Sequence, residues 1–281
     1  MFLKEAMSYG KKFLIESNSG FLDAILFLQK ITGLEKEKIL LNSDKIQLDR
    51  NMIQKFLFML KQRKKNMPVQ YIINQAEFMG IKFYVDENVL IPRSDTEILV
   101  EHVLNFISQN KKKYRILELC TGSGCISISL KKFCDYIEIN AVDIDSKAIA
   151  IAKKNAVLNS VDIKFVCADI FKIFCNEFAQ NFDMIVFNPP YIKTHEIKNL
   201  KDNVKKYEPI LALDGGNDGL KFYKFILENI KHSCNVFFEI GFDQANDIKK
   251  ILAKNNFYEI KVFKDLAGLD RVISARKNIY I

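Results

Sequence analysis

The segment that decides the fold is YRILELCTGSGCISISLKKF, residues 114–133, in which an apolar strand, a turn with two glycines and an apolar helix follow one another. The alternation continues in IEINAVDI and SKAIAIAKKNAVLN, in IKFVCAD, in FDMIVF, and in CNVFFEI with QANDIKKILAKN. Nearly continuous apolar strands separated by helices are typical of a mainly parallel sheet that is covered on both faces. We therefore predict a doubly wound, Rossmann-like α/β domain.

The residues that precede this domain have a helical periodicity. Within residues 1–66, Asp23 is expected to cap a helix that ends at Gly33. Asp49 is expected to cap the next helix, whose basic last turn suits a helix C-terminus. The sequence thus predicts a small helical domain in front of the sheet.

Two other segments predict short strands. Residues 67–97 contain apolar runs punctuated by proline and glycine, and Ser94 or Thr96 is expected to cap the helix that follows. Residues 257–277 predict two strands joined by a short loop with a glycine. The final strand is therefore expected to run antiparallel to its neighbours.

The composition limits the class of protein. With 281 residues, 49% of them hydrophobic, the chain can form one large domain and a small one. The longest apolar runs, AILFL and FLFML, are far shorter than the roughly 20 residues that a membrane span requires. The first residues lack the apolar block of a signal peptide, so we expect a cytoplasmic protein without a membrane partner.

Cysteine, histidine and charge give weaker indications. The six cysteines form no CxxC pair and the chain has three histidines, so we predict no metal site and mostly buried thiols. The formal net charge of +8 is compatible with nucleic acid as a partner. The surplus is spread as Lys along the chain, however, which favours a solvated basic surface.

The turn after the first strand of this domain predicts a ligand site. Gly122 and Gly124 let the backbone approach a ligand, and the helix that starts at Cys125 directs its N–H groups toward it. A dinucleotide fingerprint needs a third glycine where this chain has Ser127, so pyrophosphate binding is not supported. In an open α/β sheet, ligands bind beyond the carboxyl ends of the strands.

The ends of the next two strands add polar groups at the same edge. Asp143 can accept hydrogen bonds from both ribose hydroxyls, whereas Asp145 and Ser146 are better placed to cap the following helix. Asp169 can accept from an adenine amino group and Ile170 can cover the ring, although a strand-ending Asp is more often a turn former. The sequence therefore predicts a nucleoside site without a phosphate cradle, which S-adenosyl-L-methionine (AdoMet) suits best.

The fourth strand ends in NPPY, residues 188–191. Each proline has a fixed φ and no N–H, so a stiff turn is the structural explanation. In the functional explanation the Asn188 side-chain carbonyl and the Pro189 backbone carbonyl are two fixed acceptors for a substrate NH₂ group beside the methyl donor. Pro190 stiffens the turn, and Tyr191 either forms an aromatic wall for a flat substrate group or packs in the core.

The chain resembles the release-factor glutamine methyltransferases, the HemK/PrmC family, over nearly its whole length. The matching stretches are PVQYIINQAEF (68–78), VLIPRSDTEILVE (89–101), ELCTGSGCISISL (118–130), AVDID (141–145), NPPYI (188–192), YEPILALDGGNDGLKFY (207–223), FEIGFDQ (238–244) and KDLAGLDRVISAR (264–276). NPPY also occurs in DNA and RNA amino-methyltransferases. The IPRSDTE and YEP…GGNDG segments are more specific to the glutamine methyltransferases.

This resemblance implies a seven-stranded class I AdoMet-dependent methyltransferase sheet whose last strand is antiparallel. It implies a helical substrate-docking domain at 1–73, a β-hairpin linker at 74–92 and a methyltransferase domain at 93–281. The implied activity is methylation of the glutamine side-chain amide in the Gly-Gly-Gln motif of peptide chain release factors, with AdoMet as the donor and no metal.

The resemblance also implies roles for individual residues. The implied cofactor contacts are Cys120, Thr121, Gly122, Ser123, Gly124, Asp143, Ile170 and Asn188, to which the strand-end pattern adds Asp169. Asn188, Pro189, Pro190 and Tyr191 match the glutamine-binding motif, with Asn188 and Pro189 as the catalytic pair. The chain departs from the family at Cys120, where Gly is usual, at Glu118, where Asp is common, and at Asn74-Gln75. Arg93 is expected either to position a loop over the cofactor or to take part in helix capping.

Three other functions remain open on the sequence alone. A glutamine methyltransferase for a ribosomal protein would use the same chemistry, and a nucleic-acid amino-methyltransferase would suit the positive charge. A translation-associated binding module could keep the fold without the activity. We expect a monomer whose partners are release factors, with no direct contact to DNA.

Overall fold

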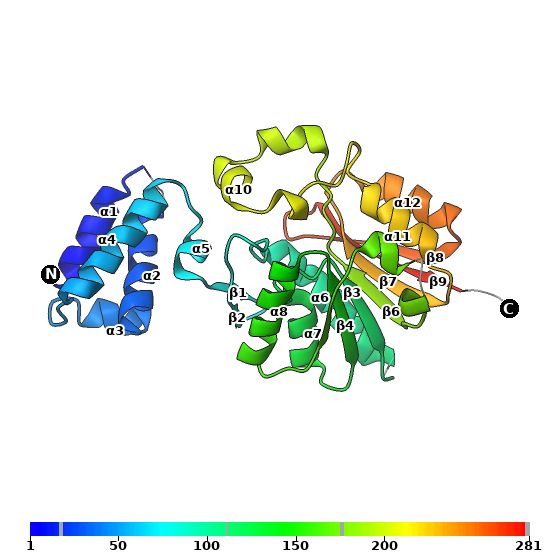
Figure 1. Cartoon of the computed structure of the whole chain (residues 1–281), viewed down its shortest axis with the longest axis horizontal. Helices are drawn as coiled ribbons and strands as arrows, with labels where there is room; N and C mark the ends of the chain where they lie inside the picture. The colour runs from blue at the N-terminus through cyan, green and yellow to red at the C-terminus, as the bar shows by residue number, and fades with distance from the viewer. Residues whose placement is uncertain (17–18, 111, 175–176, 279–281) are drawn as a thin grey trace. The chain divides into compact units, whose positions relative to one another are not determined.

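The computed structural model describes residues 1–16, 19–110, 112–174 and 177–278 (Figure 1). The described chain divides into two compact units: Met1–Gln75 with Asp202–Tyr207, and Ala76–Lys201 with Glu208–Ile281. The predicted boundaries at 73 and 92 remain a prediction. No described helix has the length and apolar character that crossing a bilayer requires.

The first unit is helical. Its elements are α1 (Leu3–Phe13), α2 (Gly20–Thr32), α3 (Lys36–Leu41), α4 (Arg50–Lys64), α5 (Val69–Ile73) and α10 (Asp202–Tyr207). Its core is a buried apolar cluster built mainly from α1, α2 and α4, with Phe27, Phe56 and Leu60 fully buried at its centre. The helical periodicity at the start of the sequence is therefore confirmed.

The predicted helix ends are partly correct. Gly33 ends α2 in the left-handed conformation, with φ 70°, and Asp49 caps α4 by accepting a hydrogen bond from the Met52 N–H at 2.7 Å. Asp23 as a cap is wrong, because α2 begins earlier, at Gly20. The Asp23 carboxylate lies buried in the first turn and accepts from Arg63 at 2.7 Å, so its role is to tie α2 to α4.

The segment before the hairpin differs from the prediction of strands. Val69–Ile73 forms the short helix α5, which starts after Pro68 and ends at Asn74. A short apolar run rich in β-branched residues fits a strand or a buried helical turn equally, so periodicity could not separate them. Asn74 has φ 51°, and Asn is one of the few residues other than Gly that adopts this conformation readily, which explains its presence where the family usually has Gly.

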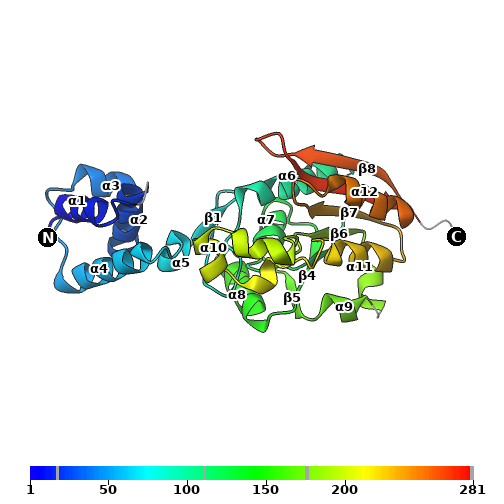
Figure 2. The same ribbon diagram turned by 90° about the horizontal axis from the view of Figure 1, so that it is seen from above.

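The second unit contains a two-stranded hairpin and a seven-stranded sheet (Figure 2). The hairpin pairs β1 (Ala76–Phe78) with β2 (Ile81–Phe83). The sheet strands are β3 (Arg115–Leu119), β4 (Glu138–Asp143), β5 (Lys164–Cys167), β6 (Met184–Phe187), β7 (Cys234–Glu239), β8 (Phe257–Lys264) and β9 (Asp270–Lys277). Their order is β5-β4-β3-β6-β7-β9-β8, and β9 runs antiparallel to both neighbours. The predicted fold, including its antiparallel last strand, is confirmed.

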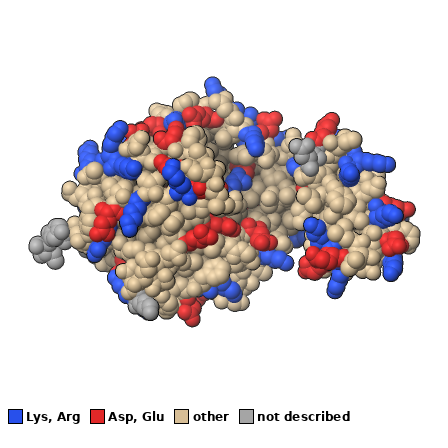
Figure 3. All heavy atoms as spheres, turned by 180° about the vertical axis from the view of Figure 1, so that it is seen from behind, with Lys and Arg blue, Asp and Glu red and all other residues tan. Residues whose placement is uncertain are grey.

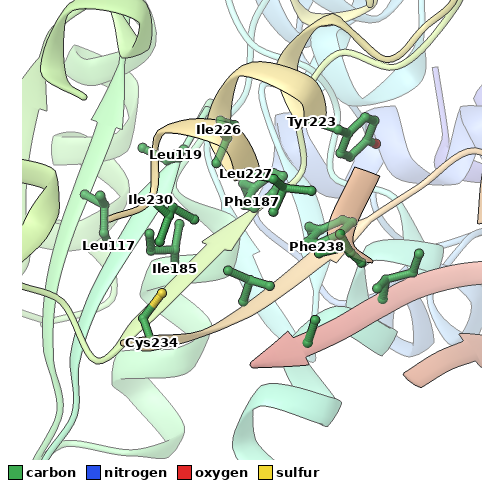
Figure 4. Close-up of a cluster of buried hydrophobic side chains, with 14 of the residues drawn as sticks. Leu117, Leu119, Ile185, Phe187, Tyr223, Ile226, Leu227, Ile230, Cys234 and Phe238 are labelled. Atoms are coloured by element: carbon green, nitrogen blue, oxygen red, sulfur yellow. The ribbon is translucent and has the colours of Figure 1, made fainter. Parts of the chain in front are cut away.

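Helices cover both faces of this sheet. They are α6 (Ser94–Asn110), α7 (Cys125–Phe133), α8 (Ser146–Leu158), α9 (Ile170–Ile173), α11 (Lys221–Asn229) and α12 (Ala245–Lys254), with the 3₁₀ turns η1 (Glu177–Gln180), η2 (Thr194–Asn199) and η3 (Ile210–Ala212). Strand residues alternate between two cores: Leu117 and Leu119 face α9, α11 and α12, whereas Ile116 faces α6 and α7. Figure 4 shows the first core, where Ile226 and Leu227 of α11 pack beside Phe187. Burial on both faces explains the nearly continuous apolar strands.

The cysteines are mostly buried, as predicted. Cys125, Cys134 and Cys234 are buried, Cys120 is half-buried and Cys167 is exposed; all five are free thiols. Cys175 lies outside the described residues. Within the described part of the chain, no three His, Cys, Asp or Glu residues gather in a way that could hold a metal ion.

Candidate active site

The order of the strands reverses at β3, which lies between β4 and β6. A cavity of about 350 Å³ lies at the carboxyl ends of these strands, where doubly wound sheets bind ligands. Its lining residues are Asn88, Val89, Leu90, Cys120, Gly122, Asp143, Ile144, Asp145, Ala148, Asp169, Ile170, Phe171, Asn188, Pro190, Pro209, Leu211, Ala212, Lys221 and Phe222. The strand-end residues singled out in the sequence thus gather at one cavity.

The glycine-rich turn contributes its backbone to this cavity. Gly122 has φ 54°, and a Cβ built on it would meet no atom within 4 Å, so the missing side chain leaves open space on the ligand side. Gly124 has φ 80° and serves packing instead, since its Cβ would lie 2.9 Å from Ile128 and 3.2 Å from Ala152 of α8. Thr121 and Ser123 are buried away from the lining.

Cys120 adopts the left-handed backbone conformation, with φ 58°, at a position where the family usually has Gly. We expect Cys120→Gly to be more stable than Cys120→Ala by about 1 kcal/mol, because the left-handed region costs a Cβ-bearing residue roughly that much. Urea unfolding of both variants measures the difference. Greater stability of the alanine variant would show that the turn does not need this conformation.

Asp143 ends β4 and faces the cavity. One of its oxygens accepts from the Gly122 N–H at 2.8 Å and the other from the Asp145 N–H at 3.0 Å. Burial raises the pKa of the Asp143 carboxyl above its usual range. Donor hydroxyl groups from a ligand would stabilise this buried carboxylate, as those of a ribose can. Asp145, as expected, caps α8 through the Lys147 N–H.

The next strand end places an acid and an apolar wall in the cavity. Asp169 accepts from the Phe171 N–H at 2.9 Å and so caps α9, while it also lines the cavity. Ile170 lies beside it, and the Phe171 and Phe222 rings, with centroids 5.7 Å apart, extend the apolar surface. This half of the cavity suits a flat, largely apolar group such as a purine ring.

A buried asparagine holds the glycine-rich turn against the segment after the hairpin. The Asn155 side chain of α8 accepts from the Tyr84 N–H at 2.7 Å and donates to the Tyr84 and Ser123 carbonyls, both at 2.9 Å. Asn155 is fully buried, so these bonds are protected from water. They fix the chain that leads to the cavity residues Asn88–Leu90, which the sequence analysis did not identify.

The NPPY turn follows β6. Asn188 and Pro190 line the cavity, whereas Pro189 is buried outside the lining and Tyr191 lines a second hollow. The Asn188 amide nitrogen donates to Glu239 Oε2 at 2.9 Å and to Thr96 Oγ1 at 3.1 Å. The Tyr191 hydroxyl donates to Glu239 Oε1 at 3.0 Å, so the turn is anchored through two side chains.

The glycines of GGNDG pack against this turn. A Cβ on Gly215 would lie 2.7 Å from Tyr191 Cα, and one on Gly219 would lie 2.5 Å from the Tyr191 carbonyl oxygen. The Gln244 side chain donates to that same carbonyl at 3.0 Å. Only glycine leaves room for so close an approach of two backbones, which gives the segment a structural role that the sequence did not reveal.

Two pairs of distant residues complete the site. Arg93 donates to the buried Glu208 at 2.5 Å and joins the IPRSDTE and YEP segments, next to the cavity residue Pro209. Arg93 also directly precedes α6, where its backbone carbonyl accepts from the Thr96 N–H at 3.1 Å, so both of its expected roles stay predictions. Ser94 and Thr96 as helix caps are both wrong, because α6 begins at Ser94 itself. The Thr96 hydroxyl instead donates to Glu239 at 2.5 Å.

The arrangement can bind a nucleoside and present an acceptor group to it. Gly122 leaves space for a ligand, Asp143 offers a buried carboxylate, and Ile170 covers a flat surface. A cavity of about 350 Å³ lies within the usual range of small-molecule sites. The residues present therefore fit AdoMet, and Asn188 stands at the same cavity with an amide whose nitrogen is already bound to protein groups.

The sequence of this chain is similar to those of known methyltransferases. Residues 94–210 match the family model described as methyltransferase small domain, and residues 5–73 match the one described as PrmC N-terminal domain. A release factor glutamine methyltransferase from Clostridium acetobutylicum is 39% identical over 98% of each chain, and one from Clostridium botulinum is 39% identical over 99% of this chain and 100% of its own. A 16S rRNA methyltransferase from T. thermophilus, solved with AdoMet and guanosine, has a TM-score of 0.50 at 15% identity, over 73% of this chain and 50% of that chain; it shows similarity of fold alone.

Proposed function

The chain belongs to the release factor glutamine methyltransferases, and from this premise we propose that it methylates the side-chain amide nitrogen of the glutamine in the Gly-Gly-Gln motif of peptide chain release factors. The methyl donor is AdoMet. The observation that carries the proposal is the position of Asn188, which lines the cavity at the strand ends together with Gly122, Asp143 and Ile170 and whose amide nitrogen is already engaged.

The cofactor is held by the carboxyl ends of the sheet strands. Gly122 admits the ligand close to the backbone, Asp143 accepts from the ribose hydroxyls, and Asp169 with Ile170 binds the adenine. Thr121, Ser123 and Gly124 shape the turn, and Cys120 lines the cavity. When bound, AdoMet supplies an electrophilic methyl group. Metal ions have no part in the proposed reaction.

The acceptor amide is held by the NPPY turn. An amide nitrogen is a poor nucleophile because its lone pair is delocalised, and its two hydrogens suit two acceptors. The Asn188 side-chain carbonyl and the Pro189 backbone carbonyl take one hydrogen each, orient the nitrogen and stabilise the positive charge that it gains during transfer. Pro190 fixes the direction of both carbonyls, because its ring restricts the backbone on each side.

No strong base is needed for this reaction, since the methylated nitrogen becomes acidic and releases its proton afterwards. Tyr191 is not a base, because burial and the neighbouring Glu239 raise the pKa of its hydroxyl far above the usual range. Its hydroxyl remains a donor to Glu239. The Tyr191 ring lines the hollow beside the turn, with Phe242 and Arg271, where residues flanking the glutamine have room.

The other parts of the chain receive proposed roles by the same premise. Residues 1–73 dock the release factor, residues 74–92 link them to the catalytic domain at 93–281, and the enzyme acts as a cytoplasmic monomer. On the face in Figure 3, Lys and Arg side chains are interspersed with Asp and Glu, an arrangement that favours a protein partner over a nucleic-acid strand.

The proposal is tested by incubating the purified chain with labelled AdoMet and, separately, intact release factor, the factor with Gln→Ala in its Gly-Gly-Gln motif, total ribosomal protein, and DNA. Label is expected on the intact factor and not on the Gln→Ala factor. Label restricted to ribosomal protein or DNA would overturn the proposed acceptor and assign the activity to one of the alternative substrates.

A further inference from the structure

A buried carboxylate lies directly behind the proposed catalytic asparagine. Glu239 is the last residue of β7 and is 2% exposed. Its Oε2 accepts from Asn188 at 2.9 Å and from Thr96 at 2.5 Å, and its Oε1 accepts from Tyr191 at 3.0 Å. One carboxylate thus binds the first and last residues of the NPPY turn together with the first turn of α6.

The hydrogen-bonding capacity of these groups fixes the direction of the Asn188 amide. An ionised carboxylate can accept but not donate, so the side of the amide that faces Glu239 must be the NH₂ group. Thr96 strengthens this choice, because its hydroxyl gives its hydrogen to Glu239 and accepts a second hydrogen bond from the Asn188 nitrogen at 3.1 Å. The Asn188 oxygen is therefore left for the cavity that this residue lines.

Glu239 is surrounded by three groups that can donate to an ionised carboxylate: the Asn188 amide, the Thr96 hydroxyl and the Tyr191 hydroxyl. Burial raises the pKa of Glu239, while the hydrogen bonds from Thr96 and Tyr191 and the positive charge of Arg271 oppose that rise. Arg271 lies on β9, where it pairs with Asp265 and Asp95. Three donor groups around one carboxylate make up for much of the cost of its burial.

We propose that Glu239 and Thr96 are positioning residues, which hold the Asn188 amide with its oxygen toward the acceptor nitrogen. The inference rests on the proposed function in one respect: the acceptor must be an NH₂ group. Without Glu239 the Asn188 amide could rotate by about 180° and present its NH₂ group to the substrate. That NH₂ group would repel the hydrogens of the substrate glutamine instead of accepting them.

Glu239→Gln provides the first test. The Gln amide can place its oxygen toward Tyr191 and its NH₂ toward Asn188, and this arrangement satisfies every group only if the Asn188 amide is reversed. In the native direction the Gln NH₂ group faces Tyr191, so the Tyr191 hydroxyl can accept from it but loses the acceptor for its own hydrogen, a buried defect that favours reversal by roughly tenfold. We therefore expect kcat to fall about tenfold, whereas the Kd for AdoMet, measured by calorimetry, stays within about twofold and the thermal midpoint does not fall.

A second readout reports the amide direction itself. Release factors with Gln→Glu or Gln→Met in the Gly-Gly-Gln motif are compared as inhibitors, and the readout is the ratio of their inhibition constants. Contacts outside the motif are the same for both factors, so they cancel in this ratio. The native site offers two oxygens and should disfavour the glutamate factor. In Glu239→Gln the reversed amide offers NH₂, and the ratio should shift toward the glutamate factor by about tenfold, in step with the loss of kcat.

A matched pair at Thr96 separates hydrogen bonding from packing. Thr96→Ser keeps the hydroxyl and should retain kcat within about threefold, whereas Thr96→Val keeps the shape, loses both hydrogen bonds and should lower kcat about tenfold. Tyr223→Phe is the control for a buried defect nearby, since its hydroxyl donates to the Glu239 backbone carbonyl at 2.8 Å and not to the side chain. That variant should lose stability and keep its rate.

Several outcomes would overturn the inference. They are an unchanged kcat in Glu239→Gln, an inhibitor ratio that does not shift, or equal losses in Thr96→Ser and Thr96→Val. Failure of the proposed function is distinct, because it appears in the wild-type enzyme as label on an acceptor other than the release factor. The same variants measured on that other NH₂ acceptor would then decide the inference.

Discussion

Asn188→Ala lowers kcat for the release factor by about 10²- to 10³-fold and changes the Kd for AdoMet by less than about threefold. The substitution removes one of the two acceptors that orient the glutamine amide and stabilise its developing positive charge. A fixed group directed at such a charge in a site shielded from water typically contributes this much. The cofactor keeps Gly122, Asp143 and Ile170, which lie on other strand ends.

The measurement combines steady-state kinetics on intact release factor with calorimetric titration of AdoMet. Asn105→Ala is the control, because Asn105 is an exposed residue of α6 outside the cavity. A variant at position 188 that keeps most of its rate would refute the two-acceptor mechanism. Loss of AdoMet binding in parallel with the rate would instead assign Asn188 to the cofactor alone.

Glu118→Gln raises the free energy of unfolding by up to about 3 kcal/mol at pH 8 and by less than about 1 kcal/mol at pH 5. Glu118 lies fully buried in β3, where its Oε2 accepts from Thr121 at 2.6 Å and its Oε1 has no partner among the described residues. Burial raises the pKa of Glu118 from 4.5 to about 7. Between these values the folded protein retains a proton that the unfolded chain has released.

The sign of the effect follows from that difference. The stability of the wild-type protein falls as the pH rises through the window from about 4.5 to 7, and it stays low above the window. Glutamine never ionises, so the variant escapes this loss. Urea unfolding at both pH values measures the effect, with exposed Glu101→Gln on α6 as the control for loss of one carboxylate. An equal gain at both pH values would point to packing rather than ionisation.

The sequence predicted the features that depend on neighbours along the chain. Apolar strands that end in glycine or aspartate identified the cavity edge, and Asp49 and Gly33 were correctly placed at helix ends. Pro68 to Ile73 was misjudged because its apolar run is too short to show a period, and one helical turn buries the same residues as a strand.

The features that sequence reasoning missed depend on residues far apart. Glu239 lies 51 positions from Asn188 and 143 from Thr96, so no local pattern joins them. FEIG could have been noticed as an acidic residue within an apolar strand, which is a signal of a buried partner. The role of the GGNDG glycines likewise depends on a distant residue, because Gly215 and Gly219 pack against the backbone of Tyr191.

The position of β9 between β7 and β8 has a consequence for the synthesis of the protein. During translation β7 and β8 leave the ribosome before β9, and neither can complete its pairing until residues 270–277 arrive. Until then β7 presents an open edge whose residues include Val236 and Phe238, both bound for the core. A nascent chain that stalls before residue 270 is therefore exposed to aggregation. Pairing of β9 with β7 and β8 is the last step in forming the sheet, and it covers the open edge of β7.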